Sequence, residues 1–397
     1  MGLVGVAGLL IALSAAYFAQ IRGSRLRFVV FVLLFVLHTA ASAVYYFYVQ
    51  TSGGDAQFYY NDPLGFYGRV GGLGTDVIIN IVQGLKENLG GSMFDYFLLF
   101  QAAGFWGLVV LAKIFQEILE EVGVQPSGWT YLPLFLPGPH YWTAAIGKDG
   151  IVFLAIALSI WATMRLGKRL QALGLAILML VAVRPHMGVL ALASLAFAAL
   201  FDRRTKLWVK GLLVVGIVVG GAAVFNNIKS TYYFDPTDAN SVSDYIESRA
   251  AIGDSFGADR SITDQTFAVR ILFLWSRPFF IDAENTLAYI ASLENIALMF
   301  MIGLILFRPG PIRALSKKIL YIRYSIAMFA STTLLVAAVN YNVGLGLRQK
   351  MMAVVPLMVI FITLIALRSA ARARAAELPN MGAQAGLTAP AEAYLKT

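Results

Sequence analysis

Apolar segments that approach the length of a membrane-crossing helix, about 20 residues, recur from one end of this chain to the other. This recurrence constrains the fold more than any other feature. Of the 397 residues, 59% are hydrophobic and only 13% are charged, which is untypical of a water-soluble globule. The short alternating strands of outer-membrane barrels are absent from the pattern. The sequence therefore predicts an all-α polytopic membrane protein.

Eleven transmembrane or partial spans are expected. Several are shorter than a full crossing, so they are predicted to be partial or broken. The N-terminus lacks a basic region and a small-residue cleavage pattern, so the first span is expected to be retained. The predicted spans are Leu3–Ala19, Phe28–Val49, Tyr96–Lys113, Trp129–His140, Ile151–Met164, Gln171–Val183, Met187–Phe201, Leu207–Phe225, Thr286–Phe307, Tyr324–Asn340 and Met352–Leu367.

The basic residues predict an orientation. Arg22, Arg25 and Arg27 follow the first span, which places that turn in the cytoplasm and the N-terminus outside. Alternating from there, the cytoplasmic side receives 20 of the 31 Lys and Arg residues but only 6 of the 22 acidic ones, and the C-terminus is cytoplasmic. The net charge of +9 therefore reflects a positive-inside bias, and no nucleic-acid partner is expected.

The expected organisation is one transmembrane domain, 1–375, followed by a disordered cytoplasmic tail, 376–397. Two long polar stretches, 51–95 and 226–285, fall outside the membrane as external loops. Because the sequence contains no P-loop and no cytoplasmic catalytic domain, its function is expected at the outer face. The absence of cysteine excludes disulfides and thiolate metal ligands. Neither a His-x-x-x-His nor an Asp-x-Asp pattern occurs, so no metal or cofactor is predicted.

The stretch VAVRPHMGVL contains the most unusual interruption. Arg184, Pro185 and His186 break an apolar run between Gln171 and Phe201. Pro185 is predicted to end the first helix, which puts the tripeptide at the outer tip of a helical hairpin. Arg184 could merely extend to lipid headgroups. A binding role is favoured, because ionisable residues at membrane depth are usually paired or functional.

The stretch GPHYWTAAIGKDG places His140, Lys148 and Asp149 between two short apolar segments. Pro137 and Pro139 are expected to prevent regular helix at its start. Asp149 could simply cap the helix that follows, since aspartate is strongly favoured at helix N-caps. No comparable structural role accounts for Lys148.

Two further stretches reach the same level. NYNVGLGLRQK brings Arg348 and Lys350 to the outer side, either as a ligand site or as ordinary cations on a glycine-rich turn. SGGDAQFYYNDP carries Asp55 directly after the second span, and Arg69 follows it. The aromatic residues between them suit either the interfacial belt or stacking on sugar rings.

The long external stretch adds three arginines. Arg249 is predicted on a short amphipathic helix. Arg270 and Arg277 are seven residues apart and share one face if their segment is helical, and Pro278 would end that helix.

These residues suggest an anion site at the outer membrane edge. Guanidinium forks suit phosphate oxygens, and His186 or His140 could act as a general base. His38, inside the second span, is predicted to be a packed, hydrogen-bonded histidine. A polyprenyl-pyrophosphate-linked glycan combines a phosphate with a long apolar chain and would fit such a site. The predicted phosphate-binding residues are Arg184, Arg277, Arg249, Arg348, Lys148, Lys350 and Arg69.

Four strings in this region resemble those of a known family. GDAQFYY, HYWTAAIGKDG, VRPHMG and RPFF…NTLAYIASLEN are similar to strings in the oligosaccharide repeat-unit polymerases of bacterial polysaccharide clusters, which are related in logic to O-antigen polymerases and ligases. The resemblance runs from about Asp55 to Asn295. It implies a bacterial inner-membrane protein whose external arginines bind the donor pyrophosphate and whose histidine activates the acceptor, without a metal.

Carried over to this sequence, the resemblance makes Arg249 and Arg277 donor-binding and His186 or His140 the base. One departure matters, because the external stretch 226–285 contains no histidine. A base drawn from that loop cannot be transferred, so it must come from the span ends or be a carboxylate.

Three functions are therefore considered. The first is a polymerase that transfers a glycan from its polyprenyl pyrophosphate to a second lipid-linked repeat unit. Its expected partners are this donor and acceptor, membrane lipids and other polysaccharide-assembly proteins. The second is a multispan glycosyltransferase that uses a polyprenyl-monophosphate sugar, with Asp55 as base, often beside a divalent metal. The third is a flippase or other transporter, which is disfavoured because the polar groups lie at one edge and no internal repeat is present.

Overall fold

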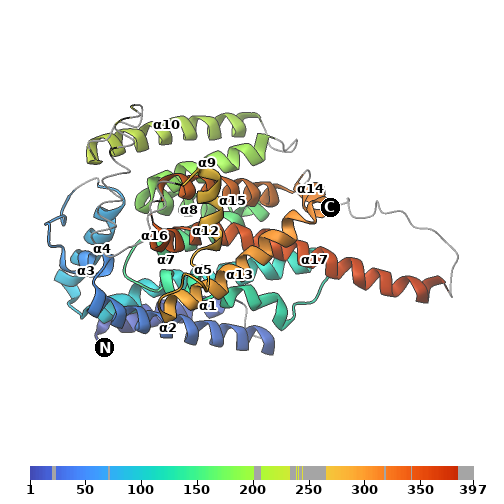
Figure 1. Cartoon of the computed structure of the whole chain (residues 1–397), viewed down its shortest axis with the longest axis horizontal. Helices are drawn as coiled ribbons and strands as arrows, with labels where there is room; N and C mark the ends of the chain where they lie inside the picture. Colours follow the sequence, from blue (N-terminus) through green and yellow to red (C-terminus); the bar gives the residue numbers. More distant parts are fainter. Residues whose placement is uncertain are drawn as a thin grey trace.

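The regular elements of the described residues are all helices (Figure 1). The computed structural model describes the chain except residues 20–23, 70–71, 201–206, 233–237, 239, 241–243, 245–264, 317–318, 341 and 383–397. The elements are α1 (Leu3–Phe18), α2 (Arg25–Ser52), α3 (Asp55–Asn61), α4 (Thr75–Leu89), α5 (Met93–Glu121), η1 (Gly128–Phe135), α6 (Pro137–Thr143), α7 (Asp149–Met164), η2 (Leu166–Lys168), α8 (Leu170–Val183), α9 (Pro185–Leu200), α10 (Leu207–Tyr232), α12 (Phe267–Ser276), α13 (Thr286–Leu306), α14 (Pro309–Ser316), α15 (Leu320–Val339), α16 (Val343–Gln349) and α17 (Met351–Gly382).

The membrane class expected from the sequence is confirmed in its main feature. Within the described residues, five helices are long and apolar enough to cross a membrane, namely α2, α5, α13, α15 and the first 25 residues of α17. Shorter apolar helices occupy most of the other predicted spans, among them α1, α7, α8 and α9. The total of eleven spans stays a prediction.

The predicted span Trp129–His140 is not one helix. It is divided between the 3-10 helix η1 and the short helix α6, with Leu136 in an extended conformation between them. The expectation that Pro137 and Pro139 prevent regular helix was wrong for this segment. Pro137 is the first residue of α6, where proline is tolerated because the first N–H groups of a helix have no intrahelical partner.

The core is built around α5 and α17, the most deeply buried long helices of the described part. α5 packs against α1, α2 and α7, and α17 packs against α15, α13 and α5. Gly104 shows why α5 can approach its neighbours so closely. A side chain there would collide with the carbonyl oxygen of Thr143, the buried last residue of α6. Small residues permit such close helix contacts in membrane proteins.

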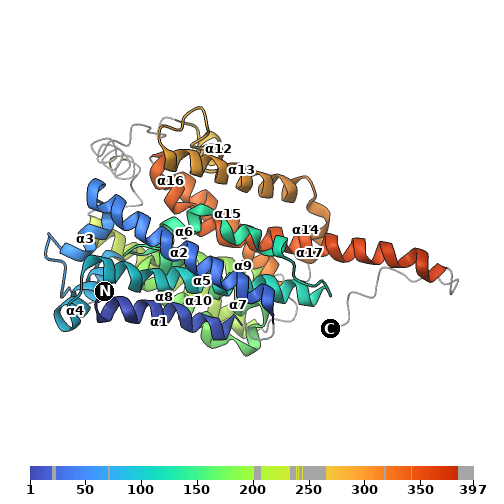
Figure 2. The ribbon, with the colours of Figure 1, turned by 90° about the horizontal axis from the view of Figure 1, so that it is seen from below.

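The bundle has two distinct ends. Helices α3, α4 and α16 lie toward one end and α14 lies toward the other, as both views show (Figures 1 and 2). The first long polar stretch, 51–95, contains α3 and α4 and connects the long helices α2 and α5. Side chains from the first end form the site described next.

Two predicted regions are only partly described. Helix α17 continues to Gly382, so it includes the first residues of the expected tail, and 383–397 lie outside the described residues. In the second polar stretch, α10 extends to Tyr232 and α12 covers Phe267–Ser276. The amphipathic helix predicted around Arg249 falls largely on residues outside the described part.

Candidate functional site

Charged side chains from four helix ends meet at the end of the bundle marked by α3. Asp55 is the first residue of α3 and Asp149 is the first residue of α7. Arg184 lies between α8 and α9, and Arg348 lies in α16. These four side chains form what we call the Asp149 network.

Asp149 holds two arginines on its two oxygens. Nη2 of Arg184 lies 2.5 Å from Oδ1, and Nε of Arg348 lies 2.6 Å from Oδ2. Arg348 also uses Nη1 to pair with the carboxylate of Asp55. The Asp149 side chain is 9% exposed, whereas that of Asp55 is 55% exposed. The network therefore runs from the buried interior to the open edge of the bundle.

The local sequence explains the position of Arg184. Pro185 disfavours helical geometry at the preceding residue, and Arg184 accordingly lies outside the helical region (φ −142°, ψ 82°), so α8 ends at Val183. Pro185 then begins α9, and the carbonyl of Arg184 accepts the first hydrogen bonds of that helix from Met187 and Gly188. The predicted hairpin is present, and Arg184 points to Asp149 rather than extending only to headgroups.

The capping role considered for Asp149 is not observed. Helix α7 begins at Asp149 itself, its N-cap is Lys148, and no side chain caps it. The carboxylate is instead used by the two arginines. Its position in the first turn still benefits from the positive end of the helix dipole.

Lys148 stands beside the network. Its Nζ donates a hydrogen bond to Oγ1 of Thr75 at 2.8 Å, which ties the start of α4 to the start of α7. Gly74, with φ +71°, allows the chain to turn just before Thr75, and its N–H binds the carbonyl of Ala182 at 2.7 Å. Burial lowers the pKa of Lys148 to about 8, and the positive charge of Arg184 contributes to the same shift.

The network retains unused hydrogen-bond donors. Among the described residues, the buried Nε of Arg184 has no hydrogen-bond partner, and the hydrogen bond found for its Nη1 is to the sulfur of Met352, at 3.5 Å. Burial acts to lower the pKa of Arg348, but the carboxylates of Asp149 and Asp55 outweigh it and raise that pKa. Three cations face two carboxylates, which leaves one positive charge in excess and suits a bound anion.

The two candidate bases occupy different surroundings. His186 reaches the surface on the first turn of α9, where desolvation and the positive charges of Arg184 and Lys148 lower its pKa to about 4. His140 is 1% exposed, and its Nε2 is hydrogen-bonded to the carbonyl of Leu134 at 2.9 Å. Its ring lies 5.4 Å from that of His38, which is fully buried and hydrogen-bonded to the carbonyl of Gln101 as the sequence suggested.

Lys350 belongs to a second polar group inside the bundle, the Lys350 cluster. Its side chain is 0% exposed, and Nζ donates to Oδ1 of Asn295. Glu294, on the same helix α13, is also buried and accepts from the N–H of Gly138. Burial lowers the pKa of Lys350 to about 8, against the opposing influence of Glu294.

The remaining predicted cations lie apart from the Asp149 network. Arg277 directly follows α12, stacks on the ring of Phe273 and pairs with Asp282, whose Oδ2 is 3.5 Å from its Nε. Arg69 is exposed and stacks on the ring of Phe66. Arg249 lies outside the described residues.

Sequence reasoning missed several members of these groups. Thr75 and Met352 carry no distinguishing pattern. Asn295 and Glu294 offered a usable signal, since a carboxylate within an apolar span is rarely idle. Their partner Lys350 was expected at the outer edge, whereas it is buried.

The fold and site together define a multispanning helical membrane protein with a charged network at one end of its bundle. Within the described residues, no group of three or more His, Asp and Glu side chains is placed to hold a metal ion. Comparison with protein-family models, curated proteins and solved structures found no match for this chain.

Proposed function

We propose that the protein is a bacterial inner-membrane polysaccharide polymerase. It transfers a glycan from polyprenyl pyrophosphate to a hydroxyl of a second lipid-linked repeat unit. The observation that carries the proposal is the pair of arginines held on one carboxylate, with Lys148 beside them. This arrangement presents preorganised donors to a diphosphate at the edge of an apolar bundle, where a polyprenyl chain can lie against the helices.

Each residue has a defined task in this reaction. Arg184 uses its free Nε and Nη1 to bind pyrophosphate oxygens, and Lys148 adds a second positive charge. Arg348 is oriented by Asp149 and Asp55. The bond between the anomeric carbon and the pyrophosphate oxygen breaks as the acceptor oxygen bonds to that carbon. The bonding electron pair stays on the pyrophosphate oxygen, so the negative charge of the leaving polyprenyl pyrophosphate increases during this step and is stabilised by the cations.

The proton of the acceptor hydroxyl passes to His186. Its exposure and its position two residues after Arg184 favour it over His140, which is buried against His38. In the cell, the site faces the periplasm, with the N-terminus outside and the C-terminus in the cytoplasm. The basic turns predicted for the cytoplasmic side support this orientation.

The decisive experiment uses purified protein and lipid-linked repeat units isolated from cells in which the gene is deleted. We expect mass analysis to detect chains of two or more units with the native protein, in EDTA as well as without it. Arg184→Ala should lose at least 100-fold of this activity. Arg69→Ala is the matched control, because it removes an exposed arginine outside the network, and it should polymerise normally. A fully active Arg184→Ala protein would contradict the proposal.

One observation favours a second function, a glycosyltransferase that uses polyprenyl-monophosphate sugars. Asp55 is the most exposed carboxylate of the network and could act as the base. In that case Asp55→Asn should abolish transfer of a single sugar, and EDTA should do the same if a divalent metal takes part. For the polymerase, Asp55→Asn should slow the reaction less than Arg184→Ala. Lipid movement across liposomes without any glycan product would instead support a flippase.

A further inference from the structure

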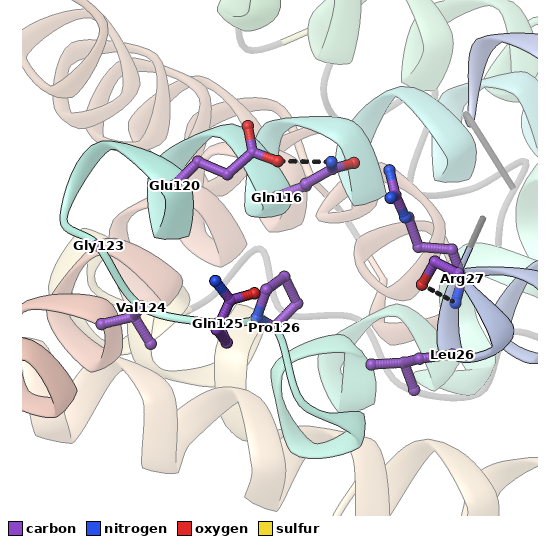
Figure 3. Close-up of a pocket in the computed structure, with 9 residues that line it drawn as sticks. Leu26, Arg27, Gln116, Glu120, Gly123, Val124, Gln125 and Pro126 are labelled. Carbon is purple, nitrogen blue, oxygen red and sulfur yellow. Dashed lines mark hydrogen bonds between the residues drawn. The ribbon is translucent and has the colours of Figure 1, made fainter. Parts of the chain in front are cut away.

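A cavity of about 380 Å³ opens at the opposite end of the bundle from the Asp149 network. It lies between the start of α2, the end of α5 and the residues 123–126 that follow α5 (Figure 3). Three polar side chains around it matter for its chemistry, those of Arg27, Gln116 and Glu120. The cavity is independent of the polymerase site, so it requires its own explanation.

A narrow apolar crevice adjoins this cavity. The crevice runs between α2 and α5, where Val30, Leu34 and Val109 line it, and it shares Arg27 and Gln116 with the cavity. A polar chamber that continues into an apolar crevice along membrane-spanning helices has the shape of a lipid site. The crevice itself is small, about 30 Å³, so the headgroup would occupy the chamber and an acyl chain would lie along the apolar surface of α2 and α5 beside the crevice.

The charges along α5 have a definite order. Lys113 borders the crevice, Gln116 stands at the junction, and Glu120 reaches the outer part of the cavity. Seven residues of helix separate Lys113 from Glu120, about 10 Å along the axis. Moving outward from the apolar crevice, a ligand therefore meets cations first and a carboxylate second.

Arg27 and Glu120 have capacity to bind such a ligand. The guanidinium of Arg27 is half-buried, and within the described residues it forms no hydrogen bond or ion pair. One oxygen of Glu120 accepts from Nε2 of Gln116 at 2.6 Å, and the other points away from Gln116 (Figure 3). A half-buried, uncompensated guanidinium is costly, so a bound anion at this position would be stabilising.

We propose that this cavity binds a phospholipid with a primary-ammonium headgroup, of the phosphatidylethanolamine class. Arg27 binds the lipid phosphate, Glu120 accepts hydrogen bonds from the ammonium group, and one acyl chain lies along the apolar surface of α2 and α5 beside the crevice. Along the site, an apolar surface is followed by a cationic and then an anionic one. Along the lipid, the acyl chain, phosphate and ammonium group follow one another in the matching order.

This arrangement also discriminates between lipids. Phosphatidylglycerol has a phosphate but no ammonium, so it leaves the Glu120 carboxylate without a partner beside an anionic ligand. Phosphatidylcholine has a quaternary ammonium with no N–H to donate, and its methyl groups keep the charge farther from a carboxylate oxygen. Both lipids are therefore expected to bind more weakly.

The test measures binding of these three lipids to the purified, delipidated protein in detergent, by native mass spectrometry and by thermal unfolding. We expect phosphatidylethanolamine to bind at least 10-fold more tightly than the other two and to raise the unfolding midpoint. Arg27→Gln should weaken its binding at least 10-fold. Arg25→Ala is the matched control, since Arg25 is an exposed arginine on the same turn that does not line the cavity, and it should bind normally.

Glu120→Gln separates lipid binding from folding, because Glu120 is exposed and its replacement leaves the core unchanged. This variant should lose the preference for phosphatidylethanolamine over phosphatidylglycerol while the protein stays folded. Equal affinity of the native protein for all three lipids would overturn the proposal. Undiminished binding by Arg27→Gln, or displacement of the lipid by equimolar polyprenyl phosphate, would overturn it as well.

Discussion

Arg348 and Lys350 are separated by one residue, yet they belong to two polar groups of opposite character. Arg348 joins the Asp149 network, which has two carboxylates and opens to the edge of the bundle through Asp55. Lys350 joins a closed cluster, where its ammonium is 0% exposed and hydrogen-bonded to a neutral amide. Charge in the first group is matched by ion pairs. In the second group, the ammonium of Lys350 is stabilised mainly by its hydrogen bond to Asn295, with Glu294 nearby.

This difference predicts which of the two groups needs its charges for stability. The Lys350 cluster can become neutral by moving a proton, and the pKa of Lys350, which burial lowers to about 8, is already suited to this. The Asp149 network cannot do the same, because arginine keeps its proton in proteins. We therefore expect the buried part of the Asp149 network to tolerate almost no change and the Lys350 cluster to tolerate a neutral replacement.

The largest effect is expected from Asp149→Ala. It leaves Arg184 and Arg348 facing each other without their shared carboxylate, and breaking a buried ion pair in this way costs about 3–5 kcal/mol. Denaturant unfolding in detergent should record this loss in the free energy of unfolding. Asp55→Ala is the control, since its carboxylate is mostly exposed, and it should have a much smaller effect. Equal losses for the two variants would remove the distinction between a buried and an open part of the network.

The next effect concerns activity and compares the two neighbours directly. For the proposed polymerase, Arg348→Ala should reduce formation of long glycan at least 100-fold, because the proposed donor site loses a positioned cation. Lys350→Met should reduce it less than 10-fold, since Lys350 is enclosed and cannot reach a ligand at the bundle edge. Chain length measured on gels of whole-cell polysaccharide, at matched protein level, gives the comparison. A larger loss from Lys350→Met would mean that the closed cluster controls the reaction.

A smaller effect follows from pH. Burial lowers the pKa of Lys148 to about 8, so this side chain is mostly charged at pH 7 and mostly neutral at pH 9. Binding of the proposed anionic donor should therefore be strong below pH 8 and weaken as the pH rises through 8, by about 10-fold overall. The arginine of Lys148→Arg keeps its charge throughout this pH range, so the affinity of this variant should not fall near pH 8. Donor affinity measured from pH 6.5 to 9.5 in both proteins tests this. If the affinity of the variant fell near pH 8 as in the native protein, a group other than Lys148 would be responsible.

The two groups also show what the sequence could predict. The helical class and most helix positions followed from hydropathy, because apolar length alone specifies a membrane helix. The RPH break correctly indicated a hairpin tip at Arg184, since proline acts locally. A signal of this kind, Pro278, also predicted that the helix would end at Arg277, and α12 ends one residue earlier, at Ser276.

Pairings between distant segments could not be predicted in the same way. Asp149 joins arginines 35 and 199 residues away in the chain, and its sequence context suited a helix cap equally well. The pattern also placed Lys350 beside Arg348 at the outer edge, because sequence spacing carries no information on which side of the α16–α17 junction faces the interior. Only the packing of α13 against α17 shows that Lys350 is buried.

The smallest effect is expected from a double substitution in the closed cluster. Lys350→Met alone leaves Asn295 and Glu294 without their cation, and we expect it to cost about 1–3 kcal/mol. Adding Glu294→Gln removes the remaining charge, while the new amide oxygen can still accept from the N–H of Gly138. The double variant should therefore recover part of that loss and lie within about 1 kcal/mol of the native protein.

No such recovery is available in the Asp149 network. Asp149→Asn combined with Arg348→Gln removes one charge of each sign, but Arg184 then keeps a fixed charge beside a neutral amide. Unfolding measurements on the four single and two double variants give two coupling energies. If the two groups differ in their need for charge, the Lys350–Glu294 double variant should regain most of the native free energy of unfolding. The Asp149–Arg348 double variant should stay well below the native value. Equal recovery in both double variants would show that the two groups differ in exposure but not in their need for charge.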